Sequence, residues 1–535
     1  MPISSAPPSG GTPASGIEHQ LVQVRNAIRT GDLARARKIS DAMLAAQPHH
    51  PGVLIQRSRL ESVDDNYRLA RGYTLSAYRA GIRNKRQCMQ LLRRLKTFNL
   101  IPELHDFIPR IPPTLSEDPD VALLLSLLMQ VLNQPQSALQ HVQAAAARHP
   151  GSSALQSEIG LAMTHLGRFD EAERHFMESL RINPGHAPAW WHLSRLPRHG
   201  GGSIHVDALK RETSRANAPA NKALLAYALH RELDGAGHHA DAADALDLAC
   251  KTMRQVVDYS AEDNKRLFSM LKALPADGSS PPSMMSDAPF TPVFIVGMHR
   301  SGTTLLEHLL SGHTEICAGG ELYDFTSQLR LAADHHCSTE LDHQIIQASG
   351  GFDYASIGAG YLDSVAYRYP GQRFVTDKLP SNFLNLGFIL RALPGARILH
   401  MSRDPIETCF SSLREPFSET TCRYSYDQVE LADYYREYFA LMQHWRQRFP
   451  GRIHDVTYAA LAADPASELK RVAAHLGVEY QSAMLEAEAN SQSVNTASAV
   501  QVRRKPSLPL RPKWQPYSEY LTPLVWRLSE IGQRY

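Results

Sequence analysis

Hydrophobic and small residues in the first half of the chain recur with the spacing of paired helices. In residues 151–193 they lead through a turn at Gly167–Asp170 to a closing proline, Pro184. Residues three or four positions apart share one face of a helix, so this pattern predicts two amphipathic helices that face each other. The positions concerned are Ile159, Gly160, Met163, Leu166, Gly167, Ala172 and Phe176.

The same pattern returns in neighbouring units. The preceding unit closes at Pro150, 34 residues before Pro184, and its positions are Leu125, Ser126, Met129, Leu132, Asn133, Ala138 and Val142. Trp190 and Leu193 begin a following unit, an earlier one contains Gly31, Ala36 and Pro48, and "LLAYALHRELDGAGHHADAADALDLA" forms a later one. Residues 51–118 are helical in pattern but fit the period poorly.

A 34-residue period with small contact residues and a closing proline resembles the tetratricopeptide repeat. The resemblance implies an all-helical superhelix whose concave surface binds a peptide or partner and carries out no chemistry itself. Unrelated helical hairpins of similar length are the alternative.

The second half of the chain changes to short apolar runs that alternate with helical segments. The expected strands are residues 293–296, 373–377, 396–402 and 452–458, and "TTLLEHLL" and "LKRVAAHLG" are among the helical segments. This alternation predicts an α/β domain with a central parallel sheet covered by helices on both faces. Ligands of such sheets bind at the carboxyl ends of the strands.

Stretches rich in proline, glycine and serine divide the chain. We expect a disordered leader over 1–16, a helical repeat domain over 17–274, a linker over 275–291 and an α/β domain over 292–535. The leader has no basic start and no apolar core, so it does not resemble a signal peptide.

Length, charge and cysteine usage limit the classes of protein to which the chain can belong. With 535 residues the chain is too long for one core, and a net charge of +2 argues against a general nucleic-acid binder. The six cysteines are scattered without a Cys-x-x-Cys pair, which suits a reducing compartment. No apolar run approaches the length of a membrane span, so the sequence predicts a cytoplasmic protein.

A phosphate-binding loop is expected where the first strand meets its helix, in "GMHRSGTT" from Gly297 to Thr304. The amides of such a turn, together with the positive end of the helix, form a seat for an anion. ATP-binding loops carry a lysine after the second glycine, but here Gly302 is followed by two threonines. Arg300 instead supplies a fixed charge from within the turn, so the loop predicts an anion site without Mg-ATP hydrolysis.

This loop resembles the 5′-phosphosulfate loop of sulfotransferases, particularly the tyrosylprotein sulfotransferases. The resemblance covers about residues 290–535 and implies 3′-phosphoadenosine 5′-phosphosulfate as co-substrate, adenosine 3′,5′-bisphosphate as product, and no metal. In the loop it implies that Arg300, Ser301, Gly302, Thr303 and Thr304 bind the nucleotide.

The resemblance also implies roles for residues outside the loop. Arg403 ends the strand of "ARILHMSRDP" and Ser411 follows eight residues later, the spacing the family uses for the 3′-phosphate; Asp404 and Pro405 are expected to begin a helix. The catalytic residues it implies are Glu321 as general base, with Arg300 and Lys378 on the transferred group. Further nucleotide contacts are Tyr458 and, in a closing loop that departs from the family pattern, Ser498, Arg503 and Lys513.

Plain structural roles compete with some of these assignments. Glu321 could instead be a solvated turn glutamate, Lys378 a surface lysine and Tyr458 a core tyrosine. His299 suits a packing role as well as a substrate contact.

Two other functions compete with a sulfotransferase. One is an ATP-dependent kinase of the phosphate-loop type, with Asp377 on a metal, and the other is a catalytically inactive repeat scaffold. The expected acceptor is a hydroxyl, with tyrosine in a peptide or protein engaged by the repeats as one candidate and a lipid, sugar or small phenol as the others.

Overall fold

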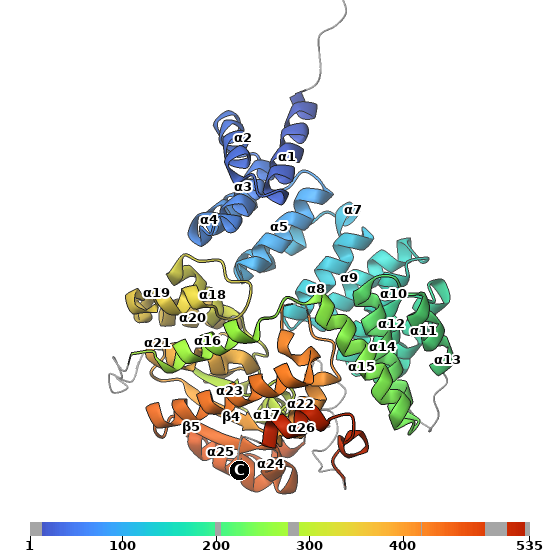
Figure 1. The fold of residues 1–535 in the computed structure, drawn as a ribbon. Coiled ribbons are helices and arrows are strands. Elements are labelled where there is room, and N and C mark those ends of the chain that lie inside the picture. The colour runs from blue at the N-terminus through green and yellow to red at the C-terminus, as the bar shows by residue number, and fades with distance from the viewer. Residues whose placement is uncertain (1–12, 198–204, 276–287, 419, 487–510, 530–535) are drawn as a thin grey trace, which may run out of the picture. The chain divides into compact units, whose positions relative to one another are not determined.

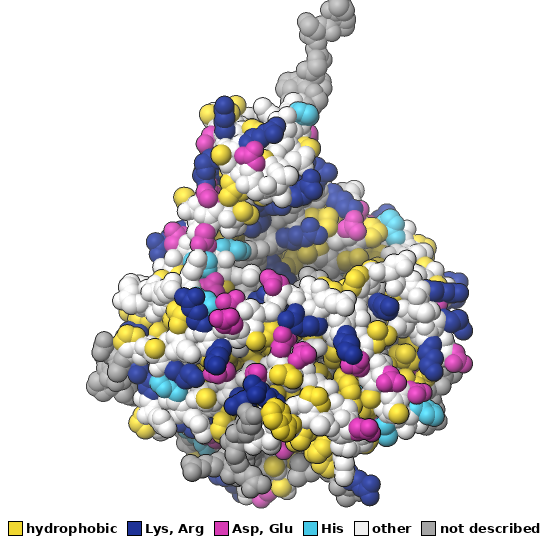
Figure 2. Space-filling view, in the orientation of Figure 1, with side chains coloured by type: hydrophobic (Ala, Val, Ile, Leu, Met, Phe, Trp, Pro, Cys, Tyr) yellow, Lys and Arg dark blue, Asp and Glu magenta, His cyan; other side chains and the backbone are white. Residues whose placement is uncertain are grey.

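A computed structural model describes residues 13–197, 205–275, 288–418, 420–486 and 511–529 (Figure 1). The chain divides into two compact units, one made of Met1–Leu115 and Leu329–His336 and the other of Ser116–Gln328 and Cys337–Tyr535. In the described residues, no helix is long and apolar enough to cross a membrane. Figure 2 shows positive and negative side chains interspersed, without one continuous basic face on the side in view.

The first unit consists of short helices. They are α1 (Pro13–Arg29), α2 (Leu33–Ala46), α3 (Pro51–Val63), α4 (Tyr67–Ala80), α5 (Lys85–Thr97), α6 (Ile101–Phe107) and the 3-10 turn η1 (Ile108–Arg110), with α7 (Pro113–Ser116) at its boundary. The distant segment 329–336 joins this unit because Asp334 receives hydrogen bonds from the start of α4, including one of 2.7 Å from the amide of Arg68 to Asp334 Oδ1.

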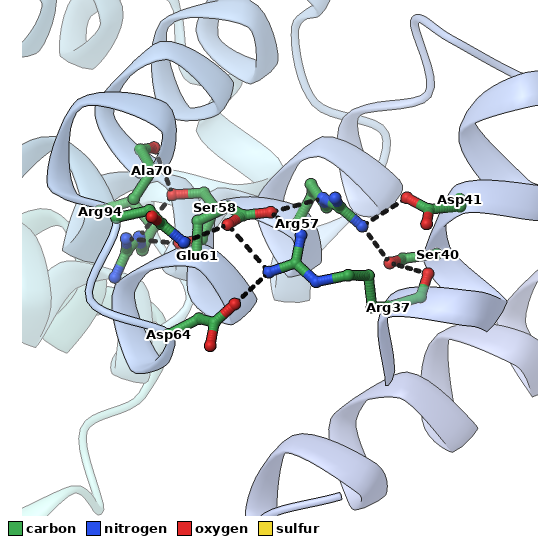
Figure 3. A network of polar contacts seen from close by, with 10 residues as sticks. Arg37, Ser40, Asp41, Arg57, Ser58, Glu61, Asp64, Ala70 and Arg94 are labelled. Carbon is green, nitrogen blue, oxygen red and sulfur yellow. Dashed lines mark hydrogen bonds and ion pairs between the residues drawn. The ribbon is translucent and has the colours of Figure 1, made fainter. Parts of the chain in front are cut away.

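A buried carboxylate holds α2, α3 and α4 together (Figure 3). The Glu61 side chain is 1% exposed, and its Oε1 lies 2.8 Å from Arg37 Nη1 and 2.9 Å from Arg57 Nε. Asn66, just before α4, donates a 3.0 Å hydrogen bond to the other oxygen. A buried charge is tolerated only when it is paired and hydrogen-bonded, so Glu61 and its partners must fold together.

The second unit begins with helical hairpins, which Figure 1 shows packed side by side. They are α8 (Pro119–Val131), α9 (Pro135–Arg148), α10 (Ser153–His165), α11 (Phe169–Ile182), α12 (Ala187–Arg195), α13 (Val206–Arg215), α14 (Pro219–Gly235) and α15 (His239–Val256). The next helix, α16 (Ala261–Lys272), packs instead against α23 (Gln428–Arg448). Gly160 shows why the pattern needs small residues, because a Cβ there would lie 2.6 Å from the Phe176 ring of the paired helix. The predicted helical hairpins are confirmed.

The sheet has five parallel strands in the order β2-β3-β1-β4-β5. They are β1 (Thr291–Val296), β2 (Ile316–Cys317), β3 (Phe374–Asp377), β4 (Arg397–Ser402) and β5 (Ile453–Thr457). The parallel sheet and four of its strands are confirmed, whereas the two-residue β2 was not predicted. Strand β1 is buried on both sides: Val293 and Ile295 pack in a core with Leu306 of the next helix, while the Phe294 ring faces Tyr361 at 5.5 Å.

Helices and 3-10 turns connect the strands and extend to the C-terminal end of the described chain. They are α17 (Thr303–Leu310), α18 (Asp324–Ala333), α19 (His343–Ala348), η2 (Ser349–Gly351), α20 (Tyr354–Arg368), η3 (Pro380–Asn385), α21 (Leu386–Ala392), α22 (Pro405–Leu413), η4 (Arg423–Tyr426), α23 (Gln428–Arg448), α24 (Tyr458–Ala463), α25 (Pro465–Leu476), η5 (Ser482–Leu485), η6 (Gln515–Tyr517) and α26 (Thr522–Ser529).

The last repeat helices dock on the α/β domain within this second unit. Arg254 of α15 makes a bidentate ion pair with Glu430 of α23, with distances of 2.8 and 2.9 Å. His230 of α14 is fully buried: its Nδ1 lies 2.8 Å from the carbonyl oxygen of Ala242, and its Nε2 accepts a 2.7 Å hydrogen bond from Arg414 Nε. His230 is therefore neutral, with its proton on Nδ1.

Replacing Glu61 with Gln should loosen the first unit, because two guanidinium groups would lose their buried carboxylate. We expect the free energy of local opening to fall by about 3 kcal/mol, seen as amide exchange in α2 and α3 faster by on the order of a hundredfold. Asp64→Asn is the control, since Asp64 is 41% exposed and should contribute under about 1 kcal/mol. Equal exchange in both variants would contradict this account.

Acid should destabilise the docked repeats through His230. Burial, with Arg414 beside it, lowers the pKa of His230 to about 3, against about 6.5 in an unfolded chain. Between these values the unfolded chain binds a proton that the native protein does not, so stability falls as the pH falls from about 6.5 to 3. In urea unfolding, His230→Asn should show a shallower loss of stability over this range; an unchanged pH dependence would refute the assignment.

Candidate active site

The predicted phosphate loop crosses the carboxyl end of β4, and both its glycines are required there. Gly297 has φ 154°, and a Cβ on it would lie 2.3 Å from the carbonyl oxygen of Met401. Gly302 has φ 112°, and its Cβ would lie 2.9 Å from Met401 Cε and 3.0 Å from the Tyr458 ring. The loop therefore lies against β4 and Tyr458, where any side chain at the two glycines would push it away.

Helix α17 follows this loop directly. Its N-cap is Gly302, which has no side chain to cap the first amides. The first-turn N–H groups of a helix, contributed here by Thr303 and Thr304, are the ordinary position for an anion. This places the predicted loop residues where they can bind a phosphate or sulfate group.

Two buried polar atoms of the loop have no hydrogen-bond partner among the described residues, namely Ser301 Oγ and His299 Nδ1. Buried polar groups are nearly always paired, so unpaired ones beside an anion seat fit a bound ligand. Burial lowers the pKa of His299 to about 4, although Glu321 nearby acts in the opposite direction. His299 is therefore a neutral ring in the site, edge-on to Phe417 at 5.8 Å.

Arg300 connects the loop to α22. It adopts φ 71°, unusual for a residue with a side chain, and its Nε donates a 3.3 Å hydrogen bond to Ser411 Oγ. Its Nη2 lies 3.9 Å from Glu415 Oε2, and both side chains are 7% exposed. Burial lowers the pKa of Arg300, but a guanidinium remains charged at neutral pH. Two predicted site residues, 111 positions apart, are thus in contact.

Glu321 and Lys378 form an ion pair at the ends of β2 and β3. Lys378 Nζ lies 2.8 Å from Glu321 Oε1; the lysine is buried, whereas the glutamate side chain is 36% exposed. Lys378 is therefore not a surface lysine. The pair combines an accessible carboxylate, able to accept a proton, with a fixed ammonium group.

Glu307, which anchors the loop carrying Glu321, was not predicted from the sequence. Its Oε1 accepts hydrogen bonds from the Gly320 amide at 3.0 Å and from Thr376 Oγ1 at 2.6 Å. Burial raises the pKa of this carboxyl, and Lys378 acts against that effect. A charged residue inside the apolar run "TTLLEHLL" was the only local signal for it.

Arg403 lies between an acid and an aromatic ring. Its Nη2 donates a 3.0 Å hydrogen bond to Glu407 Oε2, and its guanidinium lies 4.6 Å from the centre of the Tyr458 ring. The predicted helix start is confirmed, because Asp404 caps α22 by accepting from the Glu407 amide and Pro405 occupies the first turn.

The C-terminal residues of the prediction are described only in part. The amide of Lys513 donates a 2.8 Å hydrogen bond to Glu407 Oε1, so Lys513 and Arg403 share one carboxylate partner. Ser498 and Arg503 lie outside the described residues.

Asp377, the metal-binding residue of the kinase alternative, is enclosed in the core. Its oxygens accept 3.3 Å hydrogen bonds from Tyr361 and Asn382, and burial raises its pKa well above the ordinary value. Elsewhere in the described chain, no group of three or more His, Cys, Asp or Glu side chains is arranged to hold a metal ion.

Comparison with known proteins gives two family matches: a sulfotransferase family model over residues 292–482 and a tetratricopeptide-repeat model over 132–196. An uncharacterized protein of Aquifex aeolicus is 24% identical over 437 residues, which cover 77% of this chain and 55% of that protein. A protein-tyrosine sulfotransferase of Drosophila melanogaster is 22% identical over 272 residues, covering 50% of this chain and 51% of that one. The chain thus spans about half the length of these two relatives.

Similar solved structures match parts of the chain. A sulfotransferase domain of a Synechococcus olefin synthase is 20% identical with a TM-score of 0.28, covering 44% of this chain and 94% of that one. A tetratricopeptide-repeat protein with a peptide-binding site is 17% identical with a TM-score of 0.21, covering 42% and 89%. The chain therefore contains a domain that matches the sulfotransferase family over residues 292–482, preceded by a region that matches tetratricopeptide repeats over residues 132–196.

Proposed function

We propose that this chain transfers the sulfuryl group of 3′-phosphoadenosine 5′-phosphosulfate to a hydroxyl, and that tyrosine in a peptide or protein is the first acceptor to test. The sulfotransferase-family domain supports the reaction class, and the Drosophila relative's name supports tyrosine. The observation that carries the proposal is the contact between Arg300 of the loop and Ser411 of α22. This contact supports the proposal because it joins the loop assigned to the 5′-phosphosulfate to the serine assigned to the 3′-phosphate.

Glu321 is the proposed general base. Its half-open position lets an acceptor hydroxyl approach, and its carboxylate takes the hydroxyl proton as the oxygen attacks. When bound, the nucleotide supplies the sulfuryl group and leaves as adenosine 3′,5′-bisphosphate. Lys378, 2.8 Å from Glu321, has the position and charge to stabilise the oxygen of the bond that breaks.

Loop residues would stabilise the negative charge that grows on the oxygens of the sulfuryl group during transfer. The guanidinium of Arg300 and the amides at the start of α17 are fixed before the reaction begins, and donors held in place in this way contribute much of an enzyme's acceleration. Glu307 is a positioning residue, since it holds the Gly320 amide next to the base. The repeats in front of the domain are the proposed surface for a peptide or protein acceptor, because tetratricopeptide repeats generally mediate protein interactions.

An ATP-dependent kinase and an inactive scaffold are less well supported. The loop lacks the lysine that reaches the terminal phosphates of ATP, and the environment of Asp377 favours a protonated carboxyl rather than a metal ligand. A scaffold would have no need for a buried lysine paired with an accessible glutamate.

Nucleotide binding should separate these functions. We expect calorimetry on the full chain to show adenosine 3′,5′-bisphosphate binding at least about tenfold more tightly than ADP with magnesium, since only the former has a 3′-phosphate. Tighter binding of magnesium-ADP would support the kinase instead, and binding of neither nucleotide would support the scaffold.

Removal of the proposed base should affect transfer rather than binding. Glu321→Gln should lower the rate of sulfuryl transfer to tyrosyl peptides or small phenols by about 10²- to 10⁴-fold, because the proton acceptor is lost. Binding of adenosine 3′,5′-bisphosphate should change by less than about threefold. Glu315→Gln is the control: Glu315 lies in the same connection but pairs with exposed Arg373. A Glu321→Gln variant with the full rate would show that another group is the base.

A further inference from the structure

Two arginines from the helical repeats lie beside the phosphate loop. Arg195, the last residue of α12, places its Nη1 3.6 Å from Glu415 Oε1, and Arg300 of the loop approaches the other oxygen of the same carboxylate. Glu415 is buried and follows α22 by two residues. One carboxylate thus links a repeat helix to the proposed nucleotide site.

Arg231 of α14 is held next to Arg195 by a shared aromatic surface. The guanidinium groups of Arg195 and Arg231 lie 5.2 and 5.7 Å from the Trp191 ring, and Arg231 Nε donates to the Ser194 carbonyl oxygen at 3.4 Å. Cation–π contacts of this kind position an arginine without neutralising it. Both guanidinium groups are thus held next to the same indole ring, with Arg195 also facing Glu415.

The docking of α14 brings these arginines to the end of α22. Arg414 is paired with Asp234 and hydrogen-bonded to His230, and the Tyr517 hydroxyl donates to Asp234 at 2.5 Å. Arg414 follows Ser411 by three residues, on the helix that also carries Glu407, the partner of Arg403. The repeats are thus fixed to the same helix that carries the expected 3′-phosphate contact.

Among the described residues around the end of α22, the cationic side chains outnumber the carboxylates paired with them. The cationic side chains are Arg195, Arg231, Arg300, Arg403, Arg414 and Lys513. The carboxylates paired with them are Asp234, Glu407 and Glu415. Burial, with Arg414 and Arg195 nearby, lowers the pKa of Arg231 to about 9. Clustered buried charges of one sign are costly unless an anion compensates them.

The neighbours of each group indicate which end of the nucleotide this anion belongs to. The charged groups that act on Arg231 are Arg414, Arg195, Glu415 and Arg300, and those that act on Lys513 are Arg414, Arg403, Glu407 and Arg231. The groups that act on His299 are Glu321, Lys378 and Arg300. In the structure, Arg300 donates to Ser411 and shares Glu415 with Arg195, whereas Glu321 pairs with Lys378, so the arginine cluster adjoins Ser411 rather than the proposed general base.

We propose that Arg195 and Arg231 of the tetratricopeptide repeats bind the 3′-phosphate of the nucleotide together with Arg300, Arg403 and Ser411. The inference rests on the proposed function, because it assumes a nucleotide with a phosphate on its ribose. A dianionic phosphate matches the excess of guanidinium groups, which bind phosphate with directed hydrogen bonds. The repeats then complete the nucleotide site in addition to presenting an acceptor.

The test compares two nucleotides that differ only in the 3′-phosphate. Calorimetry on the full chain would measure adenosine 3′,5′-bisphosphate and adenosine 5′-monophosphate binding to Arg195→Gln and Arg231→Gln. We expect each variant to bind the bisphosphate about tenfold or more weakly, with the monophosphate changed by less than about twofold. Arg231→Lys, which keeps a charge without the planar fork, should retain part of the bisphosphate affinity.

Two controls separate phosphate binding from structural damage. Arg215→Gln removes an exposed arginine of α13 that pairs with Glu212, and should leave both affinities unchanged. Tyr517→Phe removes the hydroxyl bonded to Asp234 while keeping every arginine, so any loosening of the docked repeats should weaken both nucleotides equally.

The outcomes are distinguishable. An equal loss for both nucleotides in Arg195→Gln and Arg231→Gln, or no loss for either, would overturn the role of the repeats while leaving the proposed function standing. A parent chain that binds the bisphosphate no better than the monophosphate would instead contradict the 3′-phosphate site, and the proposed function with it.

Discussion

Burial of the Arg300 guanidinium organises the site of this protein. The group lies inside a turn that only glycine at positions 297 and 302 permits, and it is held between Ser411 and Glu415 at the end of α22. A guanidinium keeps its charge when buried, so the surrounding chain must supply dipoles or anions to it. The loop, α22 and the docked repeats meet around this group, and the proposed nucleotide would supply a further anion to it.

A second buried ionisable group, Glu307, supports the proposed catalytic residues. Glu307 on α17 holds the turn before Glu321, and Lys378 faces Glu321 from the end of β3. The helix that begins at the phosphate loop therefore also fixes the proposed base. The anion-binding turn at the start of α17 and the turn before the proposed base are thus connected through Glu307 of the same helix.

Much of the fold could be predicted because its signals are local. Strands β1, β3 and β4 are mostly buried, β5 buries only Val456, and the repeat helices follow a fixed period, whereas the two residues of β2 have no pattern of their own. The loop glycines and Arg300 were predicted from the turn itself, but roles for Ser411, Glu321 and Lys378 came only from resemblance. Arg195, Arg231 and Glu307 were missed, because their importance depends on tertiary contacts that a repeat pattern or an apolar helix does not encode.

The most direct test of this account is a crystal structure of the full chain with adenosine 3′,5′-bisphosphate. The account predicts the 5′-phosphate on the amides of residues 300–304 and the 3′-phosphate on Arg403 and Ser411. A nucleotide bound elsewhere, or one whose ribose phosphate has no contact with either residue, would contradict it.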